Sequence, residues 1–244
     1  MNLKDMILRR KSTRSFTNEP VDEQTLAQIN AFIAAATPLY PDVKVRAEIV
    51  GRESVHRFLP WTTPQLVAIF SEESEQALVN VGFLFQQLDL YLHTLGLGTC
   101  WLGMGRLNGQ GILTTKAEDG LGFVIMLAFG HPKKAQWRQT ASDFKRKPLS
   151  AISDHPDERL EVARLAPSSV NSQPWYFTHE NDTLHVHCTH QGLFRAKMLS
   201  DMNCIDVGIA LAHLFVSFPG SFRFFHVDGV TSPKGYSYLG SFSL

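Results

Sequence analysis

A chain of 244 residues, 44% hydrophobic and 19% charged, has the length and composition of a globular protein with a large buried core. Its 23 basic and 23 acidic residues cancel, which excludes a general attraction to nucleic acid or to an anionic membrane surface. We find no apolar run of membrane-spanning length and no signal-peptide core at the start. Cys100, Cys188 and Cys204 have no paired spacing. We therefore expect a cytoplasmic protein with reduced thiols.

The first part of the chain mixes helical and strand patterns. Apolar spacing predicts helices at residues 3–10, 20–36 and 74–95, and Asp22 is the expected N-cap of the second. Strand patterns occupy residues 43–50, 65–70 and 123–129. The helix at 74–95 is apolar on most sides, which is typical of the centre of a protein or of a dimer interface.

The remainder repeats part of this order after a polar connection at residues 136–156. We predict a helix at 160–166, a hairpin of strands at 175–179 and 184–188, a long helix at 203–218, and strands at 222–227 and 236–242. Placing Asn80-Val81-Gly82-Phe83 over Asp206-Val207-Gly208-Ile209 superimposes the apolar stripes of the two long helices. This overlap predicts a diverged duplication, with one repeat at 1–135, the connection at 136–156 and a second repeat at 157–244.

Two polar segments stand out as candidate ligand sites. Residues 9–16 read Arg-Arg-Lys-Ser-Thr-Arg-Ser-Phe, and guanidinium groups with a hydroxyl suit a phosphate dianion. Residues 166–175 read Ala-Pro-Ser-Ser-Val-Asn-Ser-Gln-Pro-Trp, whose amides suit the edge of a flat heterocycle and whose prolines fix the backbone. Taken singly, a solvated cationic face and an ordinary polar turn explain these segments as well.

Together with other motifs, these segments resemble the flavin-dependent nitroreductase family. Four segments follow the family's order: residues 9–16, 96–103, 130–132 and 146–149. The segment at 166–175 is out of order, because ordinary members carry it after the second helix, where residues 36–41 differ. The arrangement is similar to a branch in which two repeats in one chain imitate the family dimer. The resemblance implies an α+β fold, a three-layer α/β/α nitroreductase-like architecture that is internally duplicated.

The resemblance also implies one composite FMN site per chain, with each half supplying part of it. Its phosphate side would comprise Arg10, Ser12, Arg14, Lys145 and Arg146. Backbone at Leu102, Gly103 and Met104 would lie against the reactive face of the flavin. The ring edge or ribityl chain would contact Pro167, Ser168, Ser169 and Asn171, whereas Gln173 and Trp175 would fix the loop. No side-chain acid or base is needed, because the flavin carries the chemistry.

The implied reaction is two-electron reduction with NADH or NADPH as transient hydride donor. The partner would be a small electrophilic aromatic acceptor, such as a nitro compound or a quinone, reacting by ping-pong kinetics. A chain that contains its own pseudo-dimer is expected to be a monomer. Two alternatives stay open: an FMN-binding store or redox sensor without efficient turnover, and a degenerate fold that serves only as an interaction module.

Two other motifs are given less weight. Residues 98–101 follow a helix and lack the spacing of a dinucleotide-binding loop, so a Rossmann domain is rejected and Cys100 is expected to be a buried, inert thiol. His185 and His187 alternate on a strand near His190, but they are explained as the wet face of a hairpin whose opposite face is apolar. We expect no metal.

Overall fold

The chain folds around two antiparallel sheets, as the computed structural model of residues 2–56, 61, 63–114, 119–134, 137–189 and 196–244 shows. The first sheet has the order β1 (Val45–Gly51), β2 (Gln65–Ser71), β4 (Gly122–Gly130) and β3 (Gly98–Leu102). The second has the order β5 (Trp175–Glu180), β6 (Thr183–Thr189), β8 (Tyr236–Ser243) and β7 (Arg223–Phe225). Both sheets therefore have the same strand order, and every neighbouring pair is antiparallel.

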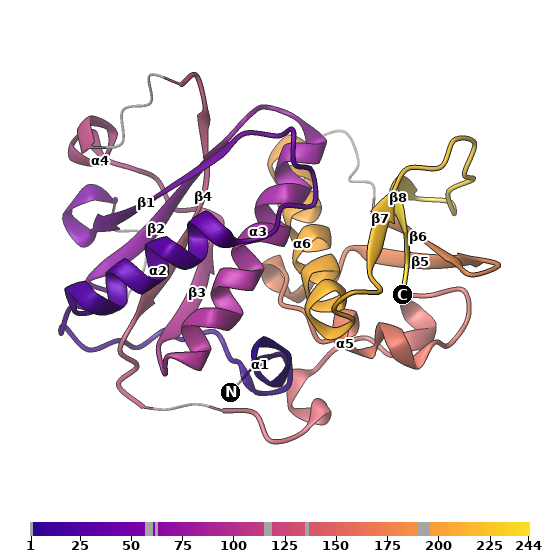
Figure 1. Ribbon diagram of the computed structural model, residues 1–244, viewed down its shortest axis with the longest axis horizontal. Coiled ribbons are helices and arrows are strands. Elements are labelled where there is room, and N and C mark those ends of the chain that lie inside the picture. The colour runs from indigo at the N-terminus through magenta and orange to yellow at the C-terminus, as the bar shows by residue number, and fades with distance from the viewer. Residues whose placement is uncertain (1, 57–60, 62, 115–118, 135–136, 190–195) are drawn as a thin grey trace.

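Two long helices lie side by side between the sheets (Figure 1). They are α3 (Glu75–Thr94), which follows β2, and α6 (Ala196–Ser217), which follows β6. The shorter helices are α1 (Leu3–Arg9), α2 (Glu23–Ala35), α4 (Gly109–Thr114) and α5 (Glu161–Arg164). The Asp22 side chain accepts a hydrogen bond from the Thr25 N–H, which confirms the predicted N-cap of α2.

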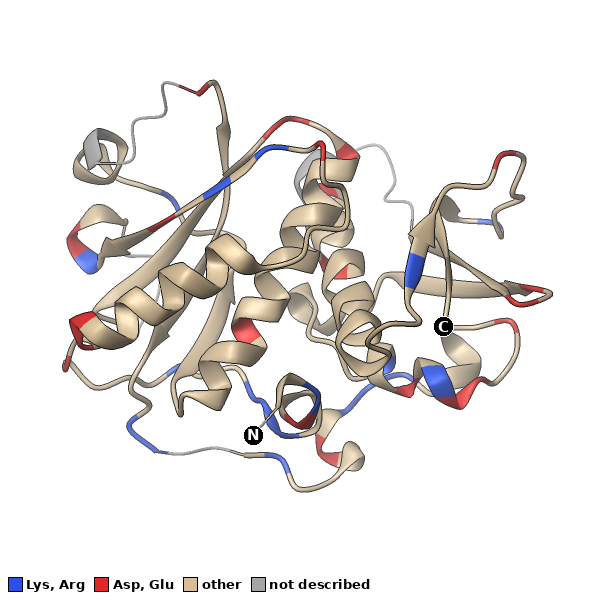
Figure 2. Ribbon diagram, in the orientation of Figure 1, with Lys and Arg blue, Asp and Glu red and all other residues tan. Residues whose placement is uncertain are grey.

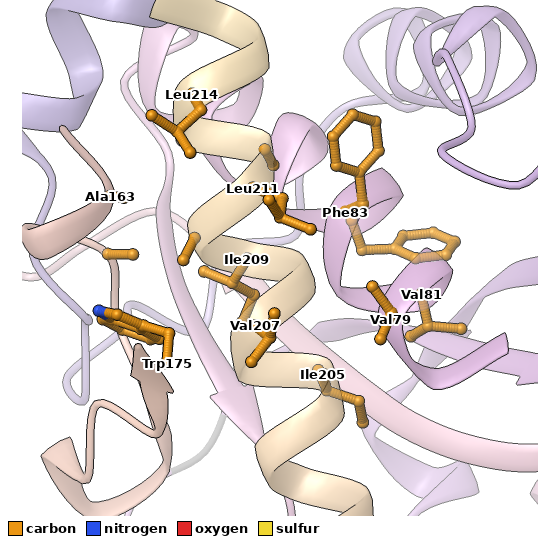
Figure 3. Close-up of a cluster of buried hydrophobic side chains, with 14 of the residues drawn as sticks. Val79, Val81, Phe83, Ala163, Trp175, Ile205, Val207, Ile209, Leu211 and Leu214 are labelled. Carbon is orange, nitrogen blue, oxygen red and sulfur yellow. The ribbon is translucent and has the colours of Figure 1, made fainter. Parts of the chain in front are cut away.

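The contact between α3 and α6 depends on one glycine in each helix. A Cβ atom on Gly82 would lie 2.0 Å from the Ile205 carbonyl oxygen, and one on Gly208 would lie 2.0 Å from the Val79 carbonyl oxygen. Glycine is required at both places because the two backbones touch. Apolar side chains of both helices gather along this contact (Figure 3). The contact is reciprocal, as in a two-fold symmetric interface.

The structure confirms the α+β class and most predicted elements. Among the α-helices and strands of the described residues, two were not predicted: β3, which spans only five residues, and α4. The helix α6 begins at Ala196, seven residues before the predicted start at 203. Within the described part of the chain, none of the helices is long and apolar enough to cross a membrane.

The prediction of a wet histidine face on β6 is wrong. His185 and His187 are both buried, because the Tyr238 ring of β8 packs close to both imidazoles and Ser232 contacts His187 from the loop before β8. His185 Nδ1 lies 2.7 Å from Ser241 Oγ, and His187 Nε2 lies 2.9 Å from Thr178 Oγ1. Burial lowers the pKa of His187 to about 4, so this imidazole is neutral at pH 7. His190 lies outside the described residues.

Candidate functional site

A cavity of about 160 Å³ joins residues from both ends of the chain. Ser12 and Arg14 line it from the N-terminal segment, and the turn before β5 contributes Pro167, Ser168 and Ser169. Its remaining walls come from β3, β4 and α6 and consist of Cys100, Trp101, Gly103, Ile125, Met202, Ile205, Asp206 and Ile209, with Val170 at the turn. The fold therefore brings together the two polar segments that the sequence singled out.

A second cavity, of about 280 Å³, adjoins the first and shares Arg14, Cys100, Trp101 and Gly103 with it. Leu102 and Met104 line this second cavity, so the predicted backbone segment lies where the two cavities meet. Apolar side chains form much of its wall, and Arg52 and His56 add basic groups. Among the described residues that line it there is no carboxylate.

The N-terminal segment is held against β3. Met6 and Ile7 of α1 are buried in one cluster with Leu90 of α3, which fixes the helix beside the core. The chain then leaves α1 at Arg10 and continues along β3, where the Thr13 N–H donates to the Thr99 carbonyl at 2.7 Å. Packing of the helix and pairing with the strand thus set the position of the cationic residues at the cavity.

Arg10 lies behind the cavity wall instead of lining the cavity. Its side chain is 1% exposed, and its Nε atom lies 2.8 Å from the Asp89 carboxylate of α3. Its Nη2 atom donates to Ser12 Oγ at 3.2 Å, so the guanidinium reaches the cavity through that hydroxyl. Burial alone would raise the pKa of Asp89, but the Arg10 charge and a hydrogen bond from Thr99 lower it. Asp89 is therefore ionised and fixes the Arg10 guanidinium.

A chain of buried polar contacts continues from Asp89 across the helix pair. Gln86 Nε2 lies 3.0 Å from Asp89 Oδ2 and 3.1 Å from His213 Nε2, and Gln86 Oε1 accepts from the Trp101 indole at 3.2 Å. His213 Nδ1 lies 2.9 Å from the Val162 carbonyl oxygen, and burial lowers the pKa of His213 to about 4. The neutral ring donates from Nδ1 and accepts at Nε2, which links α3 to α6 beneath the cavity.

Three guanidinium groups crowd together beside the N-terminal segment. Burial, followed by the charge of Arg10, lowers the pKa of Arg138 to about 10. Burial, followed by the charges of Arg138 and Arg10, lowers the pKa of Arg146 to about 10. The Arg146 Nε atom is buried and has no hydrogen-bond partner among the described residues. Figure 2 shows that part of the basic ribbon of the segments that follow α1 and β4 lies close to α1. This cluster would be stabilised by a bound anion.

The turn at residues 167–173 is strained and held by specific contacts. Val170, Asn171 and Gln173 all have a positive φ, and for Val170, a β-branched residue, φ is 46°. The Ser169 N–H donates to Asp206 of α6 at 2.9 Å, and the Gln173 N–H donates to Ser168 Oγ at 2.9 Å. Val170 is 92% exposed at the cavity, which is unusual for an apolar side chain in a strained turn.

Asn171 and Lys145 lie near the cavity but do not line it. The Asn171 side chain accepts a hydrogen bond from Arg146 Nη1 and donates to the Lys145 carbonyl at 3.2 Å. The predicted ring-edge residue therefore joins the arginine cluster to the strained turn. Gln173 fixes the loop, as expected, through a 2.8 Å hydrogen bond from the Lys147 N–H to its Oε1 atom.

Asp206 is a functional candidate that the sequence did not single out. It is 4% exposed, and burial raises its pKa well above the usual range, against hydrogen bonds that lower it. The aligned residue of α3 is Asn80, whose Oδ1 accepts from the N–H groups of Leu39 and Tyr40 at 2.9 and 3.1 Å. Asn80 and Asp206 thus each hold the loop that precedes one of the sheets, but only Asp206 is an acid that lines a cavity.

Comparison with known proteins identifies the family of the chain and relatives of its fold. Residues 2–217 match the family model described as "Putative TM nitroreductase". The crystal structure of a "putative nitroreductase" from Thermotoga maritima covers 99% of this chain and 92% of its own, with 18% identity and a TM-score of 0.65. A nitroreductase with bound FMN from Desulfitobacterium hafniense covers 61% of this chain and 99% of its own, with 17% identity and a TM-score of 0.46. Among curated proteins no match was found.

The match to the family model extends over most of the chain, and the chain belongs to this nitroreductase family. The Thermotoga structure shows that the whole fold, including both sheets, recurs in another protein.

Proposed function

We propose that the protein is an FMN-dependent NAD(P)H oxidoreductase that reduces small electrophilic aromatics. The observation that carries this proposal is the group of crowded guanidiniums beside a cavity lined from both ends of the chain. A phosphate would give Arg146 Nε the partner it lacks, and its negative charge would offset both the burial and the charge repulsion that lower the pKa of Arg146.

The residues present fit a phosphate-bearing flavin. Ser12, oriented by Arg10, together with Arg138 and Arg146 would hold the phosphate. Arg14, Gly103, Ser168 and Ser169 line the cavity beside it and would contact the rest of the cofactor. Lys145 and Asn171 would act indirectly by holding Arg146.

When bound, the flavin supplies the two-electron chemistry, with NADH or NADPH as donor and a nitro compound or quinone as acceptor. The protein's own contribution is position. Gly103 lines both cavities and Leu102 lines the larger one, so a ligand in the larger cavity would lie next to a cofactor in the smaller one. Burial raises the pKa of Cys100 and keeps its thiol protonated, which supports an inert role for this residue.

We further propose that the chain is an internal pseudo-dimer with a single site, made of repeats at 1–135 and 157–244. The identical strand order of the sheets and the reciprocal contacts of Gly82 and Gly208 support this. The Tyr40 N–H donates to Asn80 as the Ser169 N–H donates to the aligned Asp206, and the Tyr40 ring packs edge-on against Phe224 at 5.5 Å. An aromatic pair there supports loss of the second site. We propose that the protein is a monomer and that it acts in the cytoplasm.

The spectrum of the tag-free protein during anaerobic titration tests the function. The enzyme should bind FMN, lose the oxidised flavin bands on addition of NADH or NADPH, and regain them when a quinone is added. Flavin that binds but is not bleached by either nucleotide would instead support the storage or sensing alternative. Failure to bind FMN would refute both.

A further inference from the structure

A cluster of two histidines and a carboxylate lies away from the flavin cavity. Asp154 and His155 follow a short turn at Leu149–Ala151 near the end of the connection, and His179 lies in β5. One potential ligand atom from each of the three lies within 4.8 Å of those of the other two. Asp154 Oδ1 is 2.6 Å from His179 Nδ1 and 3.3 Å from His155 Nδ1. The two imidazole rings are nearly perpendicular, with centroids 5.6 Å apart.

Backbone pairing fixes the cluster in this arrangement. The Asp154 N–H donates to the Phe177 carbonyl at 3.1 Å, and the Phe177 N–H donates to the Ile152 carbonyl at 2.8 Å. The His179 N–H then donates to Asp154 Oδ2 at 3.1 Å. Ser153 Oγ donates to the His155 carbonyl at 2.6 Å. The loop and the strand therefore hold the three side chains in register before any ligand arrives.

An outer carboxylate completes the arrangement. Asp157 Oδ2 lies 3.2 Å from His179 Nε2, the ring nitrogen that points away from Asp154. Arg159 donates to both oxygens of Asp157 and fixes that carboxylate. A carboxylate on the far nitrogen of a histidine is the usual outer support of a histidine that ligates a metal, because it sets the ring orientation and raises ligand basicity.

We propose that Asp154, His155 and His179 form a Zn²⁺ site that clips the connecting segment to β5. Two imidazole nitrogens and one carboxylate are ligands of a borderline transition metal and not of Ca²⁺ or Mg²⁺. Tetrahedral ligands about 2.1 Å from Zn²⁺ lie about 3.4 Å from one another. The contact of Asp154 with His155, at 3.3 Å, already fits this spacing, and that with His179, at 2.6 Å, must open by about 0.8 Å. The ligand nitrogens of the two histidines lie within 4.8 Å of each other. The ion replaces the proton between Asp154 and His179. His155 is 74% exposed, which leaves the fourth position to water.

This site does not depend on the flavin. The expectation of no metal rested on histidines that are near one another in sequence, whereas the fold assembles these ligands from two separate segments. The ion would join the connecting segment to the sheet of the second repeat and so raise the stability of that part of the chain.

Titration of the metal-free, tag-free protein with Zn²⁺, and with Co²⁺ as a visible probe, tests the proposal. We expect one ion per chain, the intense d–d bands of four-coordinate Co²⁺, and a rise in Tm that EDTA reverses. Asp157→Asn should weaken Zn²⁺ binding by about 10- to 100-fold, and His155→Ala should weaken it further. His155 is exposed, so the variant is expected to keep the wild-type circular dichroism spectrum.

His226→Ala is the matched control, because His226 is also exposed, at 66%, and its nearest carboxylate, on Asp228, is 3.9 Å away. This variant should bind Zn²⁺ as the wild type does. The proposal is overturned if the wild type shows no binding at millimolar Zn²⁺. It is equally overturned if His155→Ala and His226→Ala bind the ion with the same affinity.

Discussion

The buried carboxyl of Asp206 makes the free energy of unfolding depend on pH. The substitution Asp206→Asn should remove this dependence. In α3 the aligned Asn80 already performs the same anchoring with an amide, since its Oδ1 accepts from two loop N–H groups. An asparagine at 206 can accept from the Ser169 N–H in the same way. The substitution therefore keeps the loop anchor and the side-chain volume and removes only the ionisable proton.

The sign and size follow from the burial of the carboxyl. Burial raises the pKa of Asp206 above the value of 3.8 that it has in the unfolded chain. Between these two values the folded protein holds one proton that the unfolded chain has released. The contribution of Asp206 to stability is therefore fully present below pH 3.8 and falls by about 1.4 kcal/mol for each pH unit up to the folded pKa. The variant has no such loss, so it should become the more stable protein as the pH rises.

Urea unfolding of both proteins from pH 4 to pH 8 measures this difference. The difference in unfolding free energy should grow with pH at the slope given above and then level off once Asp206 ionises in the folded state. A difference that stays constant from pH 4 to pH 6 would refute the reasoning. It would mean that the carboxyl is ionised in the folded protein and is stabilised by groups that the structure does not place beside it.

Three further substitutions test other parts of the account. Arg146→Met should weaken FMN binding in a fluorescence titration by about 10- to 100-fold, the value of a charge-assisted hydrogen bond to phosphate. In the same titration Arg164→Met should change FMN binding less than twofold, because Arg164 is paired with a glutamate of α5. Gly82→Ala should cost about 3 kcal/mol in urea unfolding because its Cβ meets a carbonyl of α6, and Gly109→Ala, which meets nothing within 4 Å, should not destabilise the protein. Val170→Gly should raise the apo Tm by relieving about 1 kcal/mol of left-handed strain; an unchanged or lower Tm would show that the turn is not strained.

Periodicity predicted the elements whose stability comes from their own apolar faces. The helices α2 and α3 and the strand β4 are of this kind, and Asp22 could be identified as a cap because capping is local. The strand β3 escaped prediction since it is only five residues long and directly follows a helix. The buried state of His187 also could not be predicted, because Ser232, whose hydroxyl contacts the imidazole, lies 45 residues later in the chain, in the loop before β8.

The same distinction holds for the site. The two polar segments were found by their own composition, and the cavity between them follows from folding. Arg138 could not be singled out from the sequence, because its candidate role depends on two other arginines that only the fold brings close to it. Asp206 could have been noticed as an acid in the middle of an apolar helix, aligned with Asn80. Its position beside Ser169 required the structure.

The stoichiometry of FMN binding tests the central claim most directly. If each repeat supplies the part of the site that the other lacks, titration of the monodisperse apoprotein should end at one FMN per chain, with the chain sedimenting as a monomer. Two FMN per chain would contradict the claim, since each repeat would then hold a site of its own. One FMN per two chains would contradict it as well, because the site would then require a second copy of the protein.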